Sequence, residues 1–163
     1  MFSSKSAEWE TPKWLFSKLN NEFNFTLDPC ATKENHLCDK YYTIKDDGLL
    51  QDWSGETVFV NPPYGRAIKD WVKKCYDEYV NNRITVVMLI PARTDTVWQH
   101  EYIFKEASVV CFIKGRLKFA NKFVTGKIHP APFPSQIVIF ANKVKYSTLK
   151  FLEKYGKVVM LNG

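Results

Sequence analysis

The chain is organised around the stretch Thr57-Val58-Phe59-Val60-Asn61-Pro62-Pro63-Tyr64. Its first four residues are β-branched or aromatic, which predicts a short buried strand. Gly65 and an amphipathic helix follow, so the tetrapeptide that begins at Asn61 lies on the loop leaving the carboxyl end of that strand. Open α/β sheets bind their ligands at such strand ends. We therefore expect the functional site to be built around this loop.

The chemistry of the loop follows from its residue types. Pro62 and Pro63 have no N–H and a fixed φ, so the loop is stiff and offers acceptors, namely the side-chain oxygen of Asn61 and the carbonyl of Pro62. Two such acceptors suit an NH2 group, and Tyr64 adds a flat face for stacking. Hydrogen bonds to both hydrogens would localise the nitrogen lone pair, so that the amine can attack a methyl sulfonium without a strong base. The alternative interpretation is a proline-stiffened turn.

The amino-terminal third predicts a helix followed by a strand. Thr11 suits an N-cap and Pro12 the first helical position. The alternation over residues 23–27 predicts a strand whose carboxyl end presents Asp28, where an acid could meet the ammonium group of a methionine moiety. A simple strand-ending Asp-Pro turn is equally compatible. Asp47 lies in a turn 14 residues before Asn61, and it could bind an adenine amino group.

The remaining pattern alternates between helices and strands. Apolar residues recur at helical spacing over residues 68–80, which predicts core-facing aromatics, and residues 84–90 predict a central parallel strand. A helix through Trp98, a strand over 108–113, a hairpin pairing 116–119 with 136–140, a loop over 121–134, a helix over 147–155 and a strand over 157–161 complete the chain. The predicted fold is a doubly wound α/β sheet, mostly parallel with an antiparallel hairpin at its edge and helices on both faces.

Length and composition predict one globular domain over residues 1–163. Hydrophobic residues make up 45% of the 163 residues, and no apolar run reaches membrane-spanning length. Without a signal peptide at the amino terminus, a cytoplasmic protein with free thiols is expected. Cys30, His36 and Cys38 are close in sequence, but three soft ligands do not complete a zinc site, so no metal is expected.

The positive charge is concentrated in the second part of the chain. Residues 1–106 hold 13 Lys or Arg and 16 Asp or Glu, whereas residues 107–163 hold 10 basic residues and one acid. Such segregation is typical of a polyanion partner, and we favour nucleic acid over a basic surface without a partner. It predicts that the cofactor and the chemistry belong to the first part and phosphate contacts to the second.

In combination, these blocks resemble the phage-type DNA adenine-N6 methyltransferases over nearly the whole chain. The order and spacing of the matching blocks carry the resemblance. They are Trp9-x-Thr11-Pro12, Leu27-Asp28 with Ala31, the set Asn35, Cys38, Tyr42, Asp47, Leu49 and Trp53, the loop Asn61 to Tyr64, Arg93 to Thr96 with Trp98, Gly115-Arg116 with Phe119, and Pro134-Ser135.

The resemblance implies a Rossmann-like methyltransferase sheet and S-adenosylmethionine as the donor. The flipped adenine of double-stranded DNA would be held by Asn61, Pro62, Pro63 and Tyr64. The cofactor would be lined by Trp9, Thr11, Pro12, Asp28, Pro29, Cys30, Asp47 and Leu49. Two features differ from methyltransferases at large: the loop after the first strand lacks glycines, and no acid ends a second strand to hold the ribose.

No separate target-recognition domain is expected, so loops must read the DNA. The candidates are Arg66, Arg93, Lys114, Arg116, Lys118 and Lys122, with arginine favoured for base contacts and lysine for phosphates. Two alternatives remain open at this point. One is a methyltransferase acting on RNA adenine or on protein glutamine, and the other is a basic nucleic-acid-binding protein without catalysis.

Overall fold

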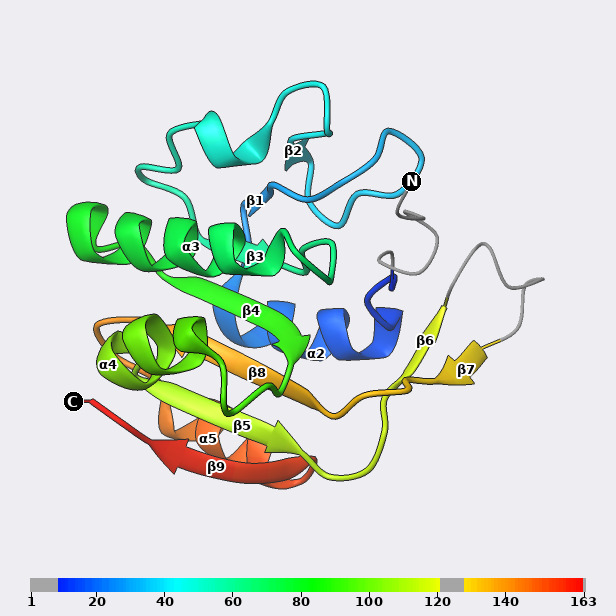
Figure 1. Cartoon of the computed structure of the whole chain (residues 1–163), viewed down its shortest axis with the longest axis vertical. Helices are drawn as coiled ribbons and strands as arrows, with labels where there is room; N and C mark the ends of the chain where they lie inside the picture. Colours follow the sequence, from blue (N-terminus) through cyan, green and yellow to red (C-terminus); the bar gives the residue numbers. More distant parts are fainter. Residues whose placement is uncertain (1–8, 121–127, 163) are drawn as a thin grey trace.

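A computed structural model of the chain describes residues 9–120 and 128–162. A mixed seven-stranded sheet forms its centre, in the strand order β2-β1-β3-β4-β8-β5-β9. Figure 1 shows α3 and α4 on the near face of this sheet, with α2 and α5 behind it. Helices therefore cover both faces, as predicted. None of the helices in the described part of the chain is long and apolar enough to cross a membrane.

The half of the sheet that carries the site is parallel. β1 (Leu27–Asp28) pairs in parallel with both β2 (Lys40–Tyr41) and β3 (Val58–Val60), and β3 pairs in parallel with β4 (Val86–Pro91). The carboxyl ends of these strands consequently share one edge of the sheet, and that edge is the usual place for a ligand. Within the described chain, residues 29–39 cross from β1 to β2 without a helix.

The other half is antiparallel. β8 (Ser135–Phe140) lies between β4 and β5 (Val109–Ile113) and runs against both, and β9 (Gly156–Met160) runs against β5 at the edge. Antiparallel ladders join more residue pairs than parallel ones, so the prediction of a mostly parallel sheet is wrong. Periodicity does not report strand direction, because a buried strand is a continuous apolar run in either orientation.

The predicted hairpin has different partners. β6 (Lys118–Ala120) pairs with β7 (Ile128–Pro130) in a separate two-stranded ribbon, and β8 is a central strand. Figure 1 shows this ribbon beyond the edge to which β4 and β5 point. Part of the predicted loop over 121–134 is thus a strand, while residues 121–127 lie outside the described residues. The β6–β7 ribbon stands beside the end of the sheet where the site is expected.

The helices form where their apolar stripes can be buried. In α3 (Ile68–Asn82), Trp71, Val72 and Cys75 are buried, as the helical spacing predicted. On the opposite face α2 (Lys13–Phe23) and α5 (Tyr146–Glu153) pack together. A π-helical turn, η2 (Gln99–Ile103), precedes the short α4 (Phe104–Glu106), and a 3-10 turn, η1 (Gly48–Leu50), lies ahead of β3.

The start of α2 differs from the prediction. The helix begins at Lys13 with Pro12 as its N-cap, and it receives no side-chain cap from the described residues. Thr11 therefore does not act as the cap. Its hydroxyl instead accepts a hydrogen bond from a residue 50 positions away, in the loop after β3. The local sequence predicted a cap because threonine before proline suits one, and the sequence around Thr11 carries no sign of its distant partner.

Candidate active site at the carboxyl edge of the parallel strands

Asn61 is the first residue after β3, and its side-chain amide is held in one orientation. Nδ2 donates to the backbone carbonyl of Trp9 at 2.6 Å and to Oγ1 of Thr11 at 2.9 Å. A carbonyl can only accept, so the NH2 end of the amide must face Trp9. Oδ1 is buried and has no hydrogen-bond partner among the described residues. The amide thus leaves one buried acceptor to be satisfied by a ligand.

Tyr64 ends the same loop and is a buried residue. Its hydroxyl donates to the carbonyl of Leu89 in β4 at 3.2 Å, and its ring stands edge-on to Phe133, with 5.3 Å between ring centroids. Burial raises the pKa of the Tyr64 phenol well above its ordinary value. The side chain is therefore neutral and fixed in place, and it lines the smaller of two cavities at this loop.

Two cavities meet at this loop. The larger has a volume of about 990 Å³ and is lined by Asn61, Pro62 and Pro63 among others, whereas the smaller, of about 480 Å³, is lined by Tyr64. Trp9 lines both cavities. The loop and Trp9 therefore separate two spaces that open at the same edge of the sheet.

The larger cavity brings together most of the predicted cofactor residues. Pro12 is buried but is not among its lining residues. The predicted residues that do line it are Trp9, Thr11, Asp28, Pro29, Cys30, Asp47 and Leu49. Residues from positions 9 to 49 thus converge on one space, although they follow different elements of the chain.

Asp28 ends β1 at the base of this cavity and is only 4% exposed. Oδ1 accepts from the N–H of Cys30 at 3.1 Å, and Oδ2 accepts from the N–H of Leu37 at 2.9 Å. Burial raises the pKa of Asp28, and these two hydrogen bonds oppose that rise. Each carboxylate oxygen keeps a further lone pair. Asp28 can therefore shape the loop over 29–37 and still accept from a ligand.

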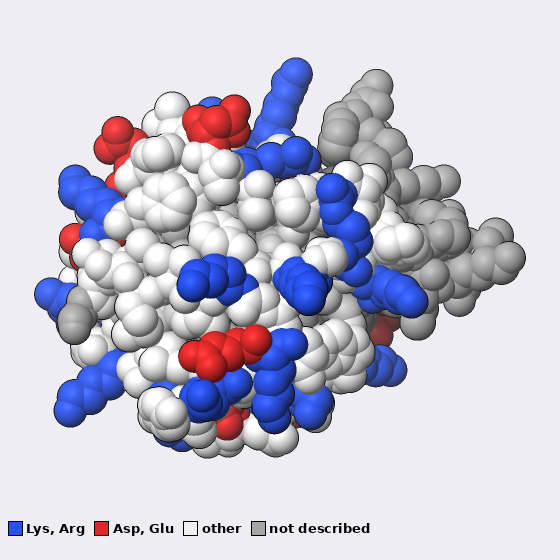
Figure 2. Space-filling model, turned by 90° about the horizontal axis from the view of Figure 1, so that it is seen from below, with Lys and Arg blue, Asp and Glu red and all other residues white. Residues whose placement is uncertain are grey.

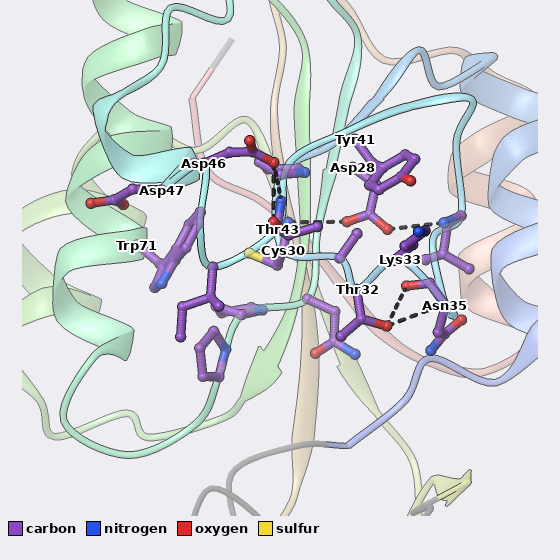
Figure 3. A pocket seen from close by; sticks show the side chains of 18 of the residues that line it. Asp28, Cys30, Thr32, Lys33, Asn35, Tyr41, Thr43, Asp46, Asp47 and Trp71 are labelled. Atoms are coloured by element: carbon purple, nitrogen blue, oxygen red, sulfur yellow. Dashed lines mark hydrogen bonds between the residues drawn. The ribbon is translucent and has the colours of Figure 1, made fainter.

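Asp47 stands on the opposite wall with Trp71 of α3. It adopts a left-handed conformation, with φ 55°, and its Oδ1 accepts from the N–H of Leu49 at 3.2 Å. In Figure 3, Asp46, Asp47 and Trp71 lie on one side of the cavity, while Thr32, Lys33 and Asn35 lie on the other. Gly48 brings the two walls together, because a Cβ there would lie 2.4 Å from the carbonyl oxygen of Pro29.

Comparison with known proteins identifies the family. Residues 2–159 match the model of the family described as DNA N-6-adenine-methyltransferase (Dam). The chain belongs to this family. A DNA N-6-adenine-methyltransferase of Haemophilus phage HP1 is 29% identical over 144 residues, which are 87% of this chain and 83% of that protein. One from Escherichia phage T1 is 31% identical over 105 residues, which are 63% of this chain and 43% of that protein.

Family membership confirms the resemblance drawn from the sequence blocks, and with it the prediction of an adenine-N6 DNA methyltransferase. The match extends over both the parallel and the antiparallel halves of the sheet, so the late basic segment is part of the family region.

Some cavity residues were missed in the sequence. Trp71 was interpreted as core alone, but it is both a core residue and part of the cavity wall. Tyr41 in β2 also lines the cavity, and its ring is stacked on His36 with 4.0 Å between centroids. The sequence does carry a signal for Tyr41, because Tyr41-Tyr42-Thr43 is a short β-prone run and the end of a strand parallel to β1 must reach the same edge of the sheet.

The charge of the larger cavity favours a cationic ligand. Its acidic lining residues outnumber the basic ones, which are Lys33 and Lys45. The acids are Glu10, Asp28, Glu34, Asp46 and Asp47. A sulfonium and an ammonium group would be attracted by this lining.

The candidate DNA contacts lie at the same edge of the sheet or next to it. Arg66 follows the loop after β3, and Arg93 follows β4 and lines the smaller cavity. Lys114 and Arg116 follow β5, which points in the same direction as β4 because both run against β8. These residues and Lys118 are exposed, and Lys122 lies outside the described residues. Figure 2 shows that basic side chains outnumber acidic ones on the face that carries β9 and α5, where they are spread widely.

The cysteines are unpaired, as predicted. Cys38, Cys75 and Cys111 are buried and Cys30 is half-buried. Burial raises the pKa of Cys38 to about 12 and that of Cys111 to about 11, so these thiols are protonated. Among residues 9–120 and 128–162, no group of three or more His, Cys, Asp or Glu side chains is arranged to hold a metal ion.

Proposed function

We propose that this chain carries out the activity of its family, methyl transfer to N6 of adenine in DNA, with the donor in the larger cavity and the target base in the smaller one. The observation that carries this proposal is the buried, unpartnered Oδ1 of Asn61. It belongs to a residue that hydrogen-bonds Trp9, and Trp9 lines both cavities. Asn61 itself lines the larger cavity, and a buried acceptor without a partner there suits an amine that offers two hydrogens and loses one of them as a proton.

The larger cavity fits S-adenosylmethionine in size and charge. Its volume of about 990 Å³ is at the upper end of the range for small-molecule sites, roughly 300–1,000 Å³. Asp28 would hold the ammonium group, Asp47 would hold the adenine amine, and Trp9, Pro29, Cys30 and Leu49 would surround the rest. Thr11 lines the same space, but its hydroxyl is bonded to Asn61, so it would give the cofactor van der Waals contact only. The bound cofactor supplies a methyl group on a positively charged sulfur.

The chain's own contribution is to prepare the amine. Oδ1 of Asn61 and the carbonyl of Pro62 accept the two N6 hydrogens, which localises the nitrogen lone pair and turns it toward the methyl group. Asn61 is not a base, so the N6 nitrogen would take the methyl group while the bond from that methyl to sulfur breaks, and the positively charged nitrogen would then release one proton to water. Tyr64 fixes the plane of the target ring, because its own position is set by the bond to Leu89 and the contact with Phe133.

The adenine must leave the duplex to reach this loop. Unstacking and unpairing cost a few kcal/mol, and contacts to the DNA backbone offset that cost. Arg93 would contact the flipped nucleotide, since it lines the smaller cavity, while Arg66, Lys114, Arg116, Lys118 and Lys122 would contact double-stranded DNA around it. We propose that residues 1–163 act as a single Rossmann-like domain in the cytoplasm of a host or bacterial cell.

The test incubates purified protein with unmethylated plasmid and labelled S-adenosylmethionine, followed by digestion and mass analysis of the nucleosides. N6-methyladenine is expected with the wild type and with Asn142→Ala, a matched control at an exposed asparagine. Asn61→Ala should reduce the yield by at least a hundredfold while it keeps cofactor binding, because the amine loses one of its two acceptors. Label in cytosine, or only in added RNA or protein, contradicts the proposal.

A further inference from the structure

The side chain of Asn61 could present either end of its amide to the target. Its two ends have the same shape, and the last torsion of asparagine is broad and roughly two-fold. A flipped amide would place an NH2 donor against the N6 amine, which is itself a donor through its hydrogens. Under the proposed function, one of the two orientations is therefore inactive, and something in the fold must select the other.

We propose that Thr11 is the positioning residue that, together with the carbonyl of Trp9, holds the Asn61 amide in its reactive orientation; this role rests on the proposed function. The Trp9 carbonyl takes one hydrogen of Nδ2 at 2.6 Å, and Oγ1 of Thr11 takes the other at 2.9 Å. Because both hydrogens are used, the plane of the amide is fixed and Oδ1 remains as the acceptor.

The two partners have different tasks. The Trp9 carbonyl can only accept, so it decides which end of the amide faces it. The Thr11 hydroxyl can donate or accept, so by itself it would tolerate either end. What it adds is a second anchor point, which stops rotation of the amide about the first bond. Thr11 is buried at 9% exposure, so water does not readily replace its hydroxyl.

The supporting segment is itself held in place. The indole of Trp9 packs edge-on against Phe119 of β6, at 5.8 Å between centroids, and against Phe133, at 5.6 Å. After Thr11, the chain enters α2 through the buried Pro12. Both acceptors are thus supplied by a segment with tertiary contacts on either side, which is what a positioning role requires.

A matched pair of variants tests this role. Thr11→Val keeps the β-branched shape and removes the acceptor, whereas Thr11→Ser keeps the hydroxyl. Since a neutral hydrogen bond in a protected site corresponds to roughly a fivefold to tenfold effect, Thr11→Val should lower kcat by about that factor. Its dissociation constant for S-adenosylmethionine, measured by calorimetry, should stay within about twofold of wild type, and Thr11→Ser should recover most of the lost rate.

A structural measurement accompanies the kinetics. In the wild type and in Thr11→Ser, both side-chain amide hydrogens of Asn61 should be protected from exchange in nitrogen-15 spectra, with Asn61→Ala providing the assignment. Thr11→Val should lose protection of one hydrogen. This readout does not depend on turnover, so it decides the positioning role even if the wild type proves inactive on DNA. Rapid exchange of both hydrogens in the wild type would overturn the positioning role. This result needs only the wild type, so it decides the question even if Thr11→Val does not fold.

Two kinetic outcomes also overturn it. One is a Thr11→Val variant as fast as an active wild type. The other is a parallel loss of rate and cofactor affinity, which would make Thr11 a ligand of the cofactor instead. An inactive wild type whose Asn61 amide is protected would refute the proposed function and leave the orientation of the amide established.

Discussion

Gly48 gives the sharpest test of the larger cavity, because a single methyl group there collides with the opposite wall. A Cβ at Gly48 would lie 2.4 Å from the carbonyl oxygen of Pro29 and 3.0 Å from the indole of Trp71. The first distance is about 1 Å inside the 3.4 Å at which ordinary van der Waals contact begins. The obstacle is backbone next to Asp28, so the loop over 29–37 must move if Gly48→Ala is to fold.

The magnitude follows from overpacking. Such insertions typically cost about 1–3 kcal/mol, and for a domain of this size each kcal/mol lowers Tm by roughly 2–4 °C. Gly48→Ala should therefore melt about 2–12 °C below the wild type. A loop displaced by about 1 Å no longer matches its ligand, so the affinity for S-adenosylmethionine should fall by about tenfold or more.

Gly55→Ala provides a matched control. It adds the same methyl group where no described heavy atom lies within 4 Å, and its cost comes only from a left-handed backbone, with φ 78°. It should lower Tm through about 1–2 kcal/mol of strain and leave cofactor affinity unchanged. Calorimetric titration and thermal melting of both variants are the assays. If Gly48→Ala bound the cofactor as tightly as Gly55→Ala does, the assignment of the cavity to the cofactor would be wrong.

Two further predictions concern acid stability and DNA binding. Oε1 of Glu22 accepts hydrogen bonds from the hydroxyls of Ser147 and Thr148 at 2.8 Å each. These bonds, helped by the charge of Lys145, hold the pKa of Glu22 below its ordinary 4.5, although desolvation opposes them. A carboxyl whose pKa is lowered by folding stabilises the protein above its unfolded pKa, and this stability is lost as the pH falls through the lowered value. The wild type should therefore melt above Glu22→Gln at neutral pH, and this difference in Tm should shrink below pH 4.5. A difference that stays constant with pH would exclude the linkage. Arg116→Ala should weaken DNA binding and leave the affinity for the cofactor unchanged. If Arg116 contacts a phosphate, the slope of log K for DNA against log salt concentration should also fall by about 1 in magnitude. Equal losses of both affinities would contradict the division between the acidic cavity and the basic loops.

Local pattern was sufficient for the elements and for the place of the site. The stripe over residues 68–80 is α3. Asp28 and Asn61 line one cavity at the same edge of the sheet, because Asp28 ends β1 and Asn61 follows the parallel strand β3. The local pattern did not predict the direction of the strands or their pairing. The run from Ile137 to Phe140 is continuously apolar, which is typical of a central strand rather than an edge, whereas a hairpin at the edge was predicted for 136–140.

The details of the catalytic loop depend on contacts that no local pattern contains. Thr11 suits a helix cap in isolation, yet its partner is 50 residues away in the chain. Tyr64 follows two prolines on a loop, which suggests exposure, but the packing of Phe133 and the carbonyl of Leu89 bury it. In both cases tertiary structure overrides the local preference of the residue.

Under the proposed function, Trp9 couples the rate of methyl transfer to the recognition of DNA. The same residue supplies the carbonyl that accepts from Asn61, lines both the larger and the smaller cavity, and packs its indole against Phe119 of the β6–β7 ribbon. A substitution that reshapes the ribbon for a new DNA sequence therefore also shifts the support of the reacting amide. Evolution of a new target site in this scaffold must be accompanied by compensating changes around residue 9, and selection for altered sequence preference should yield such paired changes.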